Sequence, residues 1–256
     1  MHELPLVFFT VLTQSAVGAY LLLLLWQSRQ PVGSDRCASI KLLGVVALFA
    51  FGGVMGSVHL GQPLRALNML AGVGRSPMSN EIVLSGIFIA CAGLGALLRW
   101  RQAALGLSRA LLGVAVPVGL LFVWTIPQIY QLDTVPHWAS GHVTLMHLLT
   151  VFIGGGALAC ALGVTWARWV MGLGIVAALT TKLGYAAFIA SSGGAALAAV
   201  TGLWQLQTAL LALALLLAAR QEPKWLPALV SVAVIAAELL GRIAFYDLWQ
   251  IGMQSR

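Results

Sequence analysis

Eight long apolar stretches account for most of the chain, and they constrain its fold more than any other feature. The hydrocarbon core of a bilayer is about 30 Å thick, so a helix that crosses it needs roughly 20 apolar residues. Stretches of that length lie at residues 4–26, 42–60, 82–100, 110–130, 142–162, 166–190, 200–219 and 225–249. With 60% apolar and only 8% charged residues, the chain is not an ordinary water-soluble domain. The sequence predicts an all-α membrane protein, a single bundle of eight transmembrane helices over residues 1–256.

The first apolar stretch has the position of a signal peptide, but we expect it to be retained as a helix. No Lys or Arg precedes it, and residues 4–26 exceed the apolar region of a signal peptide, which is about 7 to 15 residues long. The loops are short except for residues 61–80, so no separate soluble domain is predicted.

Basic residues fall unevenly on the two sides of the predicted bundle. One side carries Arg29, Arg36, Lys41, Arg99, Arg101, Arg109, Arg168, Arg220 and Lys224. The other side carries Arg65, Arg75 and Arg256. By the positive-inside rule the richer side is cytoplasmic, which makes both termini and the 61–80 loop periplasmic in a bacterial inner membrane. The basic residues form no patch that could follow a phosphate backbone, so we expect no nucleic-acid binding.

The segment from His59 to Glu81 is a polar island between two apolar stretches. Ionisable groups at membrane depth cost several kcal/mol in hydrocarbon, so they are normally paired, wet or held in a pocket. Pro63 predicts that the preceding helix ends after His59. Ser79 or Asn80 offers an N-cap to the next helix, which would place Glu81 in its positive first turn. We therefore expect the imidazole and the carboxylate to lie at the same membrane boundary.

From the residues alone, this island is as consistent with a structural lock of the loop as with a ligand site. Arg65 and Arg75 supply countercharges near Glu81. A carboxylate held at a membrane boundary is suited to exchange a proton with a bound quinol. Both interpretations stay open at this point.

Further ionisable side chains lie in or beside the predicted spans. They are Asp133, His137, His142, His147, Lys182, Glu238, Arg242 and Asp247. Glu238 and Arg242 are four residues apart, so a structural ion pair within one helix is the favoured interpretation. Alternatively, Arg242 also holds a polar ligand or a neighbouring loop. The sequence gives no role for Lys182.

Histidines and cysteines give no clear sign of a bound metal centre. His142 and His147 are five residues apart, about 140° around a helix, so they do not share a face as haem ligands on one helix would. Cys37, Cys91 and Cys160 are isolated and match no zinc or iron–sulfur spacing. We expect no haem and no iron–sulfur cluster in this protein.

A family resemblance rests on ordered sequence pieces that run from one end of the sequence to the other. They are residues 2–6 (HELPL), 9–10 (FT) and 14 (Q), 59–68 (HLGQPLRALN), 73–76 (VGRS), 79–82 (SNEI), 122–124 (FVW), 130 (Y), 133–136 (DTVP) and 138 (W), 238–242 (ELLGR) and 245–246 (FY). With these pieces the sequence resembles the membrane-anchor subunit of the anaerobic dimethyl sulfoxide reductase family. The central island and the 238–242 piece are the specific part of the match.

The resemblance implies an eight-helix anchor that binds menaquinol and contains no haem. It implies two partners, a four-cluster iron–sulfur subunit and a molybdopterin catalytic subunit. In that family, residues matching His59 and Glu81 are tied to quinol binding and oxidation, which makes these two the catalytic candidates. Arg65 and Arg242 are the further candidates for the quinol site, for ordering the loop and balancing charge. Because we expect no redox centre in this protein, the iron–sulfur subunit should dock on the outer face, beside the island.

Three other functions remain open. The protein could anchor a related complex for another oxo- or sulfur substrate, including one that reduces quinone. Buried charges such as Lys182 also fit a small-solute transporter, but we find none of the inverted repeats that transporters often show. A scaffold that only tethers catalytic subunits is the third. The terminal acceptor, the direction of electron flow, the quinone and the side of proton release are not predicted.

Overall fold

The computed structural model describes residues 3–29, 35–58, 63–192, 194–220 and 223–254. Within these ranges it has no strand and contains eight helices that are long and apolar enough to cross a membrane. They are α1 (Leu4–Gln27), α2 (Asp35–Val58), α3 (Pro77–Trp100), α4 (Leu105–Ile129), α5 (Gly141–Ala161), α6 (Ala167–Ser192), α7 (Gly194–Ala218) and α8 (Leu226–Gln254). A short 3-10 helix, η1 (Pro63–Gly72), lies between α2 and α3. The predicted all-α bundle of eight helices is confirmed.

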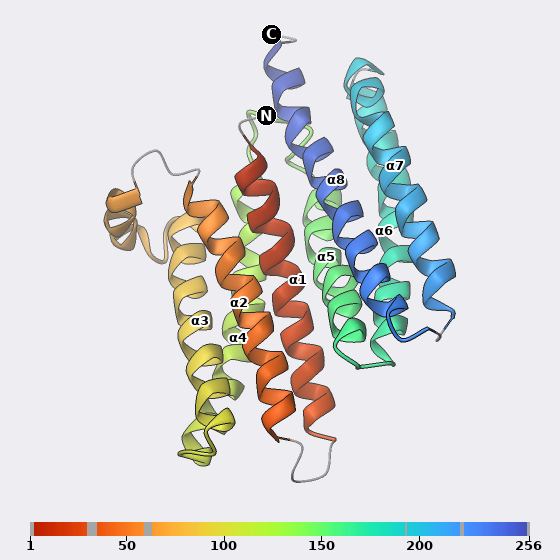
Figure 1. Ribbon diagram of the computed structural model, residues 1–256. Helices are drawn as coiled ribbons and strands as arrows, with labels where there is room; N and C mark the ends of the chain where they lie inside the picture. Colours follow the sequence, from red (N-terminus) through yellow and green to blue (C-terminus); the bar gives the residue numbers. More distant parts are fainter. Residues whose placement is uncertain (1–2, 30–34, 59–62, 193, 221–222, 255–256) are drawn as a thin grey trace.

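Helix α1 is the central helix of the bundle. In Figure 1, α2, α3 and α4 lie on one side of α1, and α5 to α8 lie on the other. Every residue from 10 to 20 is buried, and this run includes the polar side chains of Thr10, Thr13, Gln14 and Ser15. A helix surrounded by protein on all sides can carry polar groups that would be costly against lipid. Helix α1 therefore joins the two halves of the bundle and brings polar groups into its interior.

Small residues let α1 and α5 approach very closely. A β-carbon added to Gly18 would overlap the carbonyl oxygen of Val151, and one added to Gly155 would lie 2.5 Å from the Cα of Gly18. Lipid tails are as apolar as the helices, so helices associate in a bilayer through such close packing rather than through the hydrophobic effect. The contact between α1 and α5 thus fixes the two halves of the bundle against each other.

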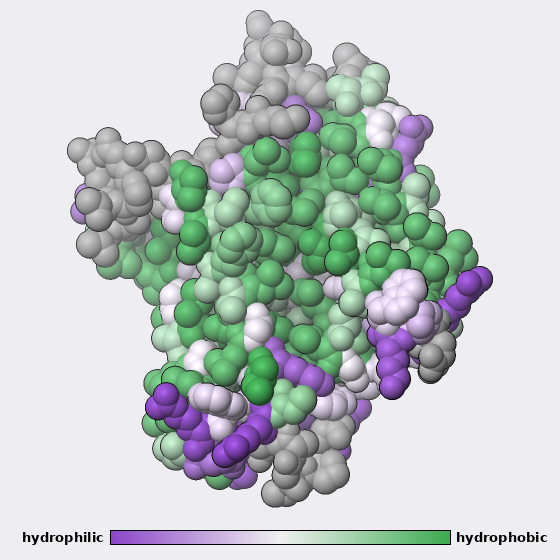
Figure 2. Space-filling view, in the orientation of Figure 1, coloured by the Kyte–Doolittle hydropathy of each residue, from purple (hydrophilic) through white to green (hydrophobic). Residues whose placement is uncertain are grey.

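The described basic residues of the loops gather mainly at one end of the bundle. Helices α1, α3, α5 and α7 end there, at the bottom of Figure 1, and hydrophilic side chains cover this end in Figure 2. Helix η1, the start of α1 and the last turns of α8 lie at the opposite end. This division agrees with the uneven distribution in the sequence, and the assignment of the η1 end to the periplasm stays a prediction.

We predict that Gly18→Ala destabilises the protein, because its methyl group has no room against Val151. Overpacking of this kind costs about 1–3 kcal/mol. Gly44→Ala on α2 is the matched control, since a β-carbon there meets no atom within 4 Å. Thermal unfolding of both purified variants in one detergent measures the difference, and equal midpoints would contradict the close packing.

Candidate functional site

A cavity of about 260 Å³ lies between α1, α2 and α3 near the η1 end of the bundle. Its lining comes from Leu6, Phe9, Gly53, Gly56, Ser57, Met78, Glu81, Ile82 and Ser85. Two glycines of α2 help to create the space. A β-carbon on Gly56 would lie 2.9 Å from the ring of Phe9, whereas one on Gly53 would meet no atom within 4 Å. The open side of α2 therefore faces this cavity.

Glu81 is the ionisable side chain among the described residues that line this cavity. It is 7% exposed, and its Oε1 atom has no hydrogen-bond partner within the described ranges. Buried polar groups are nearly always hydrogen-bonded, so an unpartnered carboxylate oxygen calls for a ligand or a water. The side chain is therefore placed to bind something in the cavity.

The predicted start of the helix that carries Glu81 was wrong. Helix α3 begins at Pro77, after an extended Ser76, because a proline fits the first helical position, where its missing N–H is not needed. Ser79 and Asn80 lie inside the helix instead of capping it, and Glu81 lies in its second turn. Asn80 orders the loop differently, since its Oδ1 accepts a 2.7 Å hydrogen bond from the N–H of Gly74. Glu81 is thus deeper than a residue of the first turn.

Two predicted site residues cannot be placed beside Glu81. His59 lies outside the described residues, and Arg65 belongs to η1 but its side chain lies outside the described part of the protein. Ser57, two residues before His59, lines the same cavity as Glu81. Arg75, expected as a countercharge near Glu81, is exposed and donates a 3.1 Å hydrogen bond to the carbonyl of Ala71 on η1.

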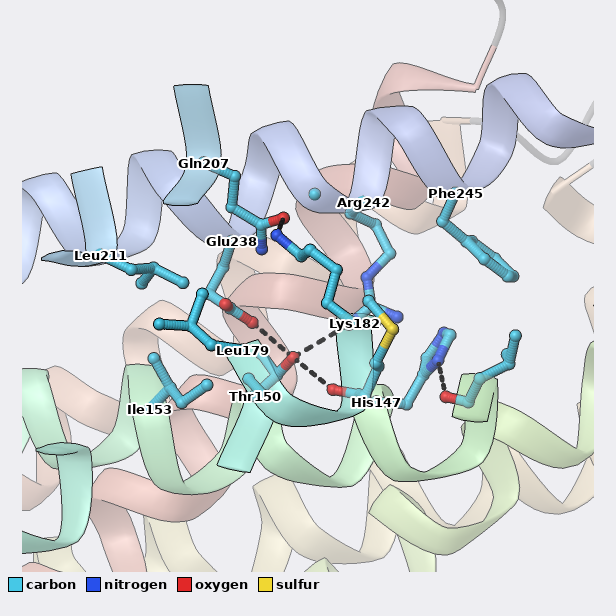
Figure 3. Close-up of a pocket in the computed structure, with 14 residues that line it drawn as sticks. His147, Thr150, Ile153, Leu179, Lys182, Gln207, Leu211, Glu238, Arg242 and Phe245 are labelled. Atoms are coloured by element: carbon cyan, nitrogen blue, oxygen red, sulfur yellow. Dashed lines mark hydrogen bonds between the residues drawn. The ribbon is translucent and has the colours of Figure 1, made fainter. Parts of the chain in front are cut away.

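Arg242, the fourth candidate, does not line the Glu81 cavity. One of its terminal nitrogens donates hydrogen bonds to Gln14 Oε1 at 3.0 Å and to Thr150 Oγ1 at 3.1 Å. Thr150 in turn donates a 2.6 Å hydrogen bond to Glu238 Oε2 (Figure 3). The expected pair of Glu238 and Arg242 is therefore joined through a hydroxyl from α5, and Gln14 brings in α1.

Lys182 extends this network across the second half of the bundle. Its Nζ atom donates to Gln207 Oε1 at 2.6 Å and to Thr208 Oγ1 at 3.4 Å. Side chains from α5, α6, α7 and α8 converge there around a cavity of about 30 Å³, enough for one water (Figure 3). Sequence reasoning missed Thr150 and Gln207, and it used Gln14 only as part of the family match without predicting its contact with Arg242. The sequence feature that could have identified these residues is a neutral polar side chain inside an apolar stretch.

An aromatic cluster lies between the Glu81 cavity and this polar network. The hydroxyls of Tyr130 and Tyr246 are hydrogen-bonded to each other, and Glu81 and Arg242 both interact electrostatically with the two tyrosines. Trp138 packs on the same cluster and donates a 2.9 Å hydrogen bond to the carbonyl of Phe245. The fold thus brings three of the family-matching sequence pieces together at one place.

The histidines outside the polar island have structural surroundings. His142 stacks on Tyr185, whereas buried His147 stacks on Tyr130 and donates a 2.8 Å hydrogen bond from Nδ1 to the backbone carbonyl of Val143. The two rings therefore face different neighbours, as their spacing predicts. In the loop after α4, burial lowers the pKa of His137 below its ordinary value. No group of three or more potential metal ligands occurs among the described residues.

Comparison with known proteins gives one consistent result. A family model described as "DMSO reductase anchor subunit (DmsC)" matches residues 1–248. The protein is 39% identical over 167 residues to the YnfH chain of anaerobic dimethyl sulfoxide reductase from Escherichia coli, a match that covers 63% of this protein and 57% of the relative. It is 39% identical over 168 residues to the C chain of anaerobic dimethyl sulfoxide reductase from Haemophilus influenzae, which covers 63% and 59%. The matches thus span less than two thirds of each relative.

We predict that Thr150→Val destabilises the protein although it preserves the shape of the side chain. It removes a partner from Glu238 and from Arg242, and a buried polar group left without a partner costs about 1–3 kcal/mol. Thr180→Val is the matched control, because the exposed Thr180 hydroxyl only donates to the carbonyl of Val176 on its own helix. The measurement is thermal unfolding of both variants, and an unchanged midpoint for Thr150→Val would contradict this account.

Proposed function

Because the protein belongs to the DMSO reductase anchor subunit family, we propose that it is the quinol-oxidising membrane anchor of a molybdopterin and iron–sulfur reductase complex. The proposed site of menaquinol is the cavity between α1, α2 and α3. The observation that carries the proposal is the buried Glu81 carboxylate, which has an unpartnered oxygen and lines a cavity of about 260 Å³. Small-molecule sites are typically apolar cavities of this order, with a few well-placed polar groups.

The polar atoms of the described lining suit a quinol because they can accept hydrogen bonds. The hydroxyls of Ser57 and Ser85 each donate to a carbonyl of their own helix, at 2.7 and 2.8 Å, which leaves their oxygens as acceptors. The Glu81 oxygen is a further acceptor. A quinol headgroup brings two O–H donors, and the apolar walls formed by Phe9 and Ile82 suit its ring.

The isoprenoid tail has an exit toward the lipid. Val54 and Val58 on α2 are 59% and 68% exposed, and Met78 at the rim of the cavity is 40% exposed. Exposed apolar side chains on a transmembrane helix are in contact with acyl chains. The headgroup can thus occupy the cavity while the tail extends between the helices and the bilayer.

Oxidation of a quinol releases two electrons and two protons, and the proposed roles divide these products. Glu81 accepts one proton from a quinol oxygen as the electrons leave, acting as a general base. His59 is the proposed hydrogen-bond partner of the second quinol oxygen, and the proton of that oxygen passes to the surrounding water. Both electrons pass to the iron–sulfur subunit, which then supplies the molybdopterin subunit. Arg65 is assigned to ordering the loop, and Arg242 to balancing charge through the tyrosine pair.

The iron–sulfur subunit is proposed to dock at the η1 end, which the positive-inside rule assigns to the periplasm. Electrons must reach that subunit directly from the quinol, so the docking surface should lie close to the cavity. At the η1 end, Leu70 on η1 and Val73 in the turn before α3 are 49% and 46% exposed. These apolar side chains lie at an end of the bundle, where a soluble subunit can cover them. The catalytic subunit determines which substrate the complex reduces.

We predict that Glu81→Gln lowers menaquinol-dependent activity of the assembled complex by about 100-fold or more, because the amide keeps the shape but cannot act as the base. Activity with an artificial electron donor to the catalytic subunit should stay unchanged. For His59→Asn we expect the same pair of results, a loss of menaquinol-dependent activity and unchanged activity with the artificial donor. Asp133→Asn, in the exposed loop after α4, is the control and should leave both activities intact. Full menaquinol activity of Glu81→Gln would disprove the assigned role.

We predict that Gly53→Leu blocks the cavity without disturbing the packing. The new side chain extends into open space that the quinol headgroup would occupy, so the apparent KM for menaquinol should rise about tenfold or more, as expected if about 1.4 kcal/mol of binding is lost. Gly86→Leu on α3 is the control, because its β-carbon also meets no atom within 4 Å and Gly86 does not line the cavity. Equal KM values for the two variants would place the quinol elsewhere.

A further inference from the structure

Two adjoining hollows lie at the end of the bundle opposite the Glu81 cavity. The first, of about 100 Å³, lies where α5 and α7 end and α6 and α8 begin, and both Arg168 and Arg220 border it. The second, of about 210 Å³, is bordered by Arg168 and Trp169. Arg168 and Ala218 border both hollows, so the two form one continuous depression. Neither the quinol site nor the network around Arg242 includes these residues.

The charge of this depression is positive. Two guanidinium groups border it, and no carboxylate occurs among the described residues that line it. Arg168 is half-buried, and its guanidinium carbon lies 5.2 Å from the ring centre of Trp169, a distance that favours a cation–π interaction. This contact holds the side chain at the junction of the hollows. The depression therefore favours an anionic ligand.

Its depth corresponds to the headgroup region of the bilayer. Trp169 and Trp225 are 65% and 61% exposed beside it, and exposed tryptophans of membrane proteins prefer the interface between lipid and water. Further along the helices, Leu173 and Leu216 are exposed apolar residues of the kind that face acyl chains. Figure 2 shows hydrophilic surface at this end and hydrophobic surface above it.

The walls of the depression are apolar on the side that leads into the bilayer. Met171 and Val230 line the first hollow, and Leu215 lines the second. Along the membrane normal, the cationic groups thus lie toward the water and the apolar groups lie toward the bilayer interior. An anionic phospholipid has the complementary order, with its phosphate above its acyl chains, whereas a free phosphate ion has no apolar part to fill the walls.

We propose that this depression is a binding site for an anionic phospholipid. The phosphodiester lies between Arg168 and Arg220, and the first part of an acyl tail lies against Leu215. Basic pockets between transmembrane helices at the cytoplasmic side are suited to anionic headgroups, which agrees with the predicted orientation. The bound lipid joins the ends of four helices, α5 to α8. This inference does not depend on the proposed quinol oxidation.

The test uses the purified full-length protein and compares retention of phosphatidylglycerol with that of phosphatidylcholine by native mass spectrometry. Arg168→Gln/Arg220→Gln should retain phosphatidylglycerol about thirtyfold more weakly than the unaltered protein, since each arginine contributes about a factor of five or more. Arg101→Gln/Arg109→Gln removes two exposed charges at the same end, one directly after α3 and one in α4, and should retain phosphatidylglycerol normally. Equal retention by both double variants would overturn the site, as would equal retention of the two lipids by the unaltered protein.

A second variant separates a shaped site from general attraction to positive charge. Ala218→Leu keeps both arginines but fills the junction of the hollows, so it should also lose phosphatidylglycerol. Normal retention by this variant would show that the depression is not the binding site. Inorganic phosphate should not displace the lipid, and displacement would overturn the assignment to a phospholipid. Unchanged thermal unfolding of each variant excludes loss of the fold as the cause.

Discussion

The guanidinium of Arg242, buried where α8 meets α1 and α5, is the constraint on which the helix arrangement depends. An arginine in a protein stays protonated, and an ion in hydrocarbon costs several kcal/mol unless protein groups satisfy it. Its hydrogen bonds to Gln14 and Thr150 require α1 and α5 to lie beside α8. The same α1–α5 interface contains Gly18 and Gly155, whose lack of side chains permits the approach. Close packing and charge satisfaction thus select the same arrangement.

The tyrosine pair gives this network a physical connection to the Glu81 cavity. Tyr246 lies one helical turn beyond Arg242 on α8, and its hydroxyl meets that of Tyr130 at the end of α4. Glu81 and Arg242 both act electrostatically on the two hydroxyls, with opposite sign. The attraction between the Arg242 cation and the two tyrosine hydroxyls weakens with distance, as any Coulomb interaction does. This arrangement supports the proposed role of Arg242 in charge balance although it does not line the cavity.

Sequence reasoning could predict the eight helices because apolar length is a local property that the bilayer imposes directly. It could not predict the start of α3 correctly, since Pro77 suggests a break but is favourable at a first helical position. The spacing of Glu238 and Arg242 correctly indicated two neighbouring charges. The bridge between them comes from Thr150, on another helix 88 residues away from Glu238, so only the tertiary structure reveals it. The polar context of Glu81 identified it as a candidate, but the sequence could not show that one of its carboxylate oxygens lacks a hydrogen-bond partner.

The number of charges in a cavity is a poor guide to which cavity is the better candidate for the proposed quinol site. The space beside Lys182, Glu238 and Arg242 is richer in ionisable groups, but it has about 30 Å³, and many of its polar atoms already bond to one another. Gln14 Nε2 and His147 Nε2 have no partner among the described residues, but the space has room for a water and not for an aromatic ring. The Glu81 cavity has about 260 Å³ and an acceptor without a partner. Volume together with an unsatisfied polar atom therefore argues for the cavity between α1, α2 and α3.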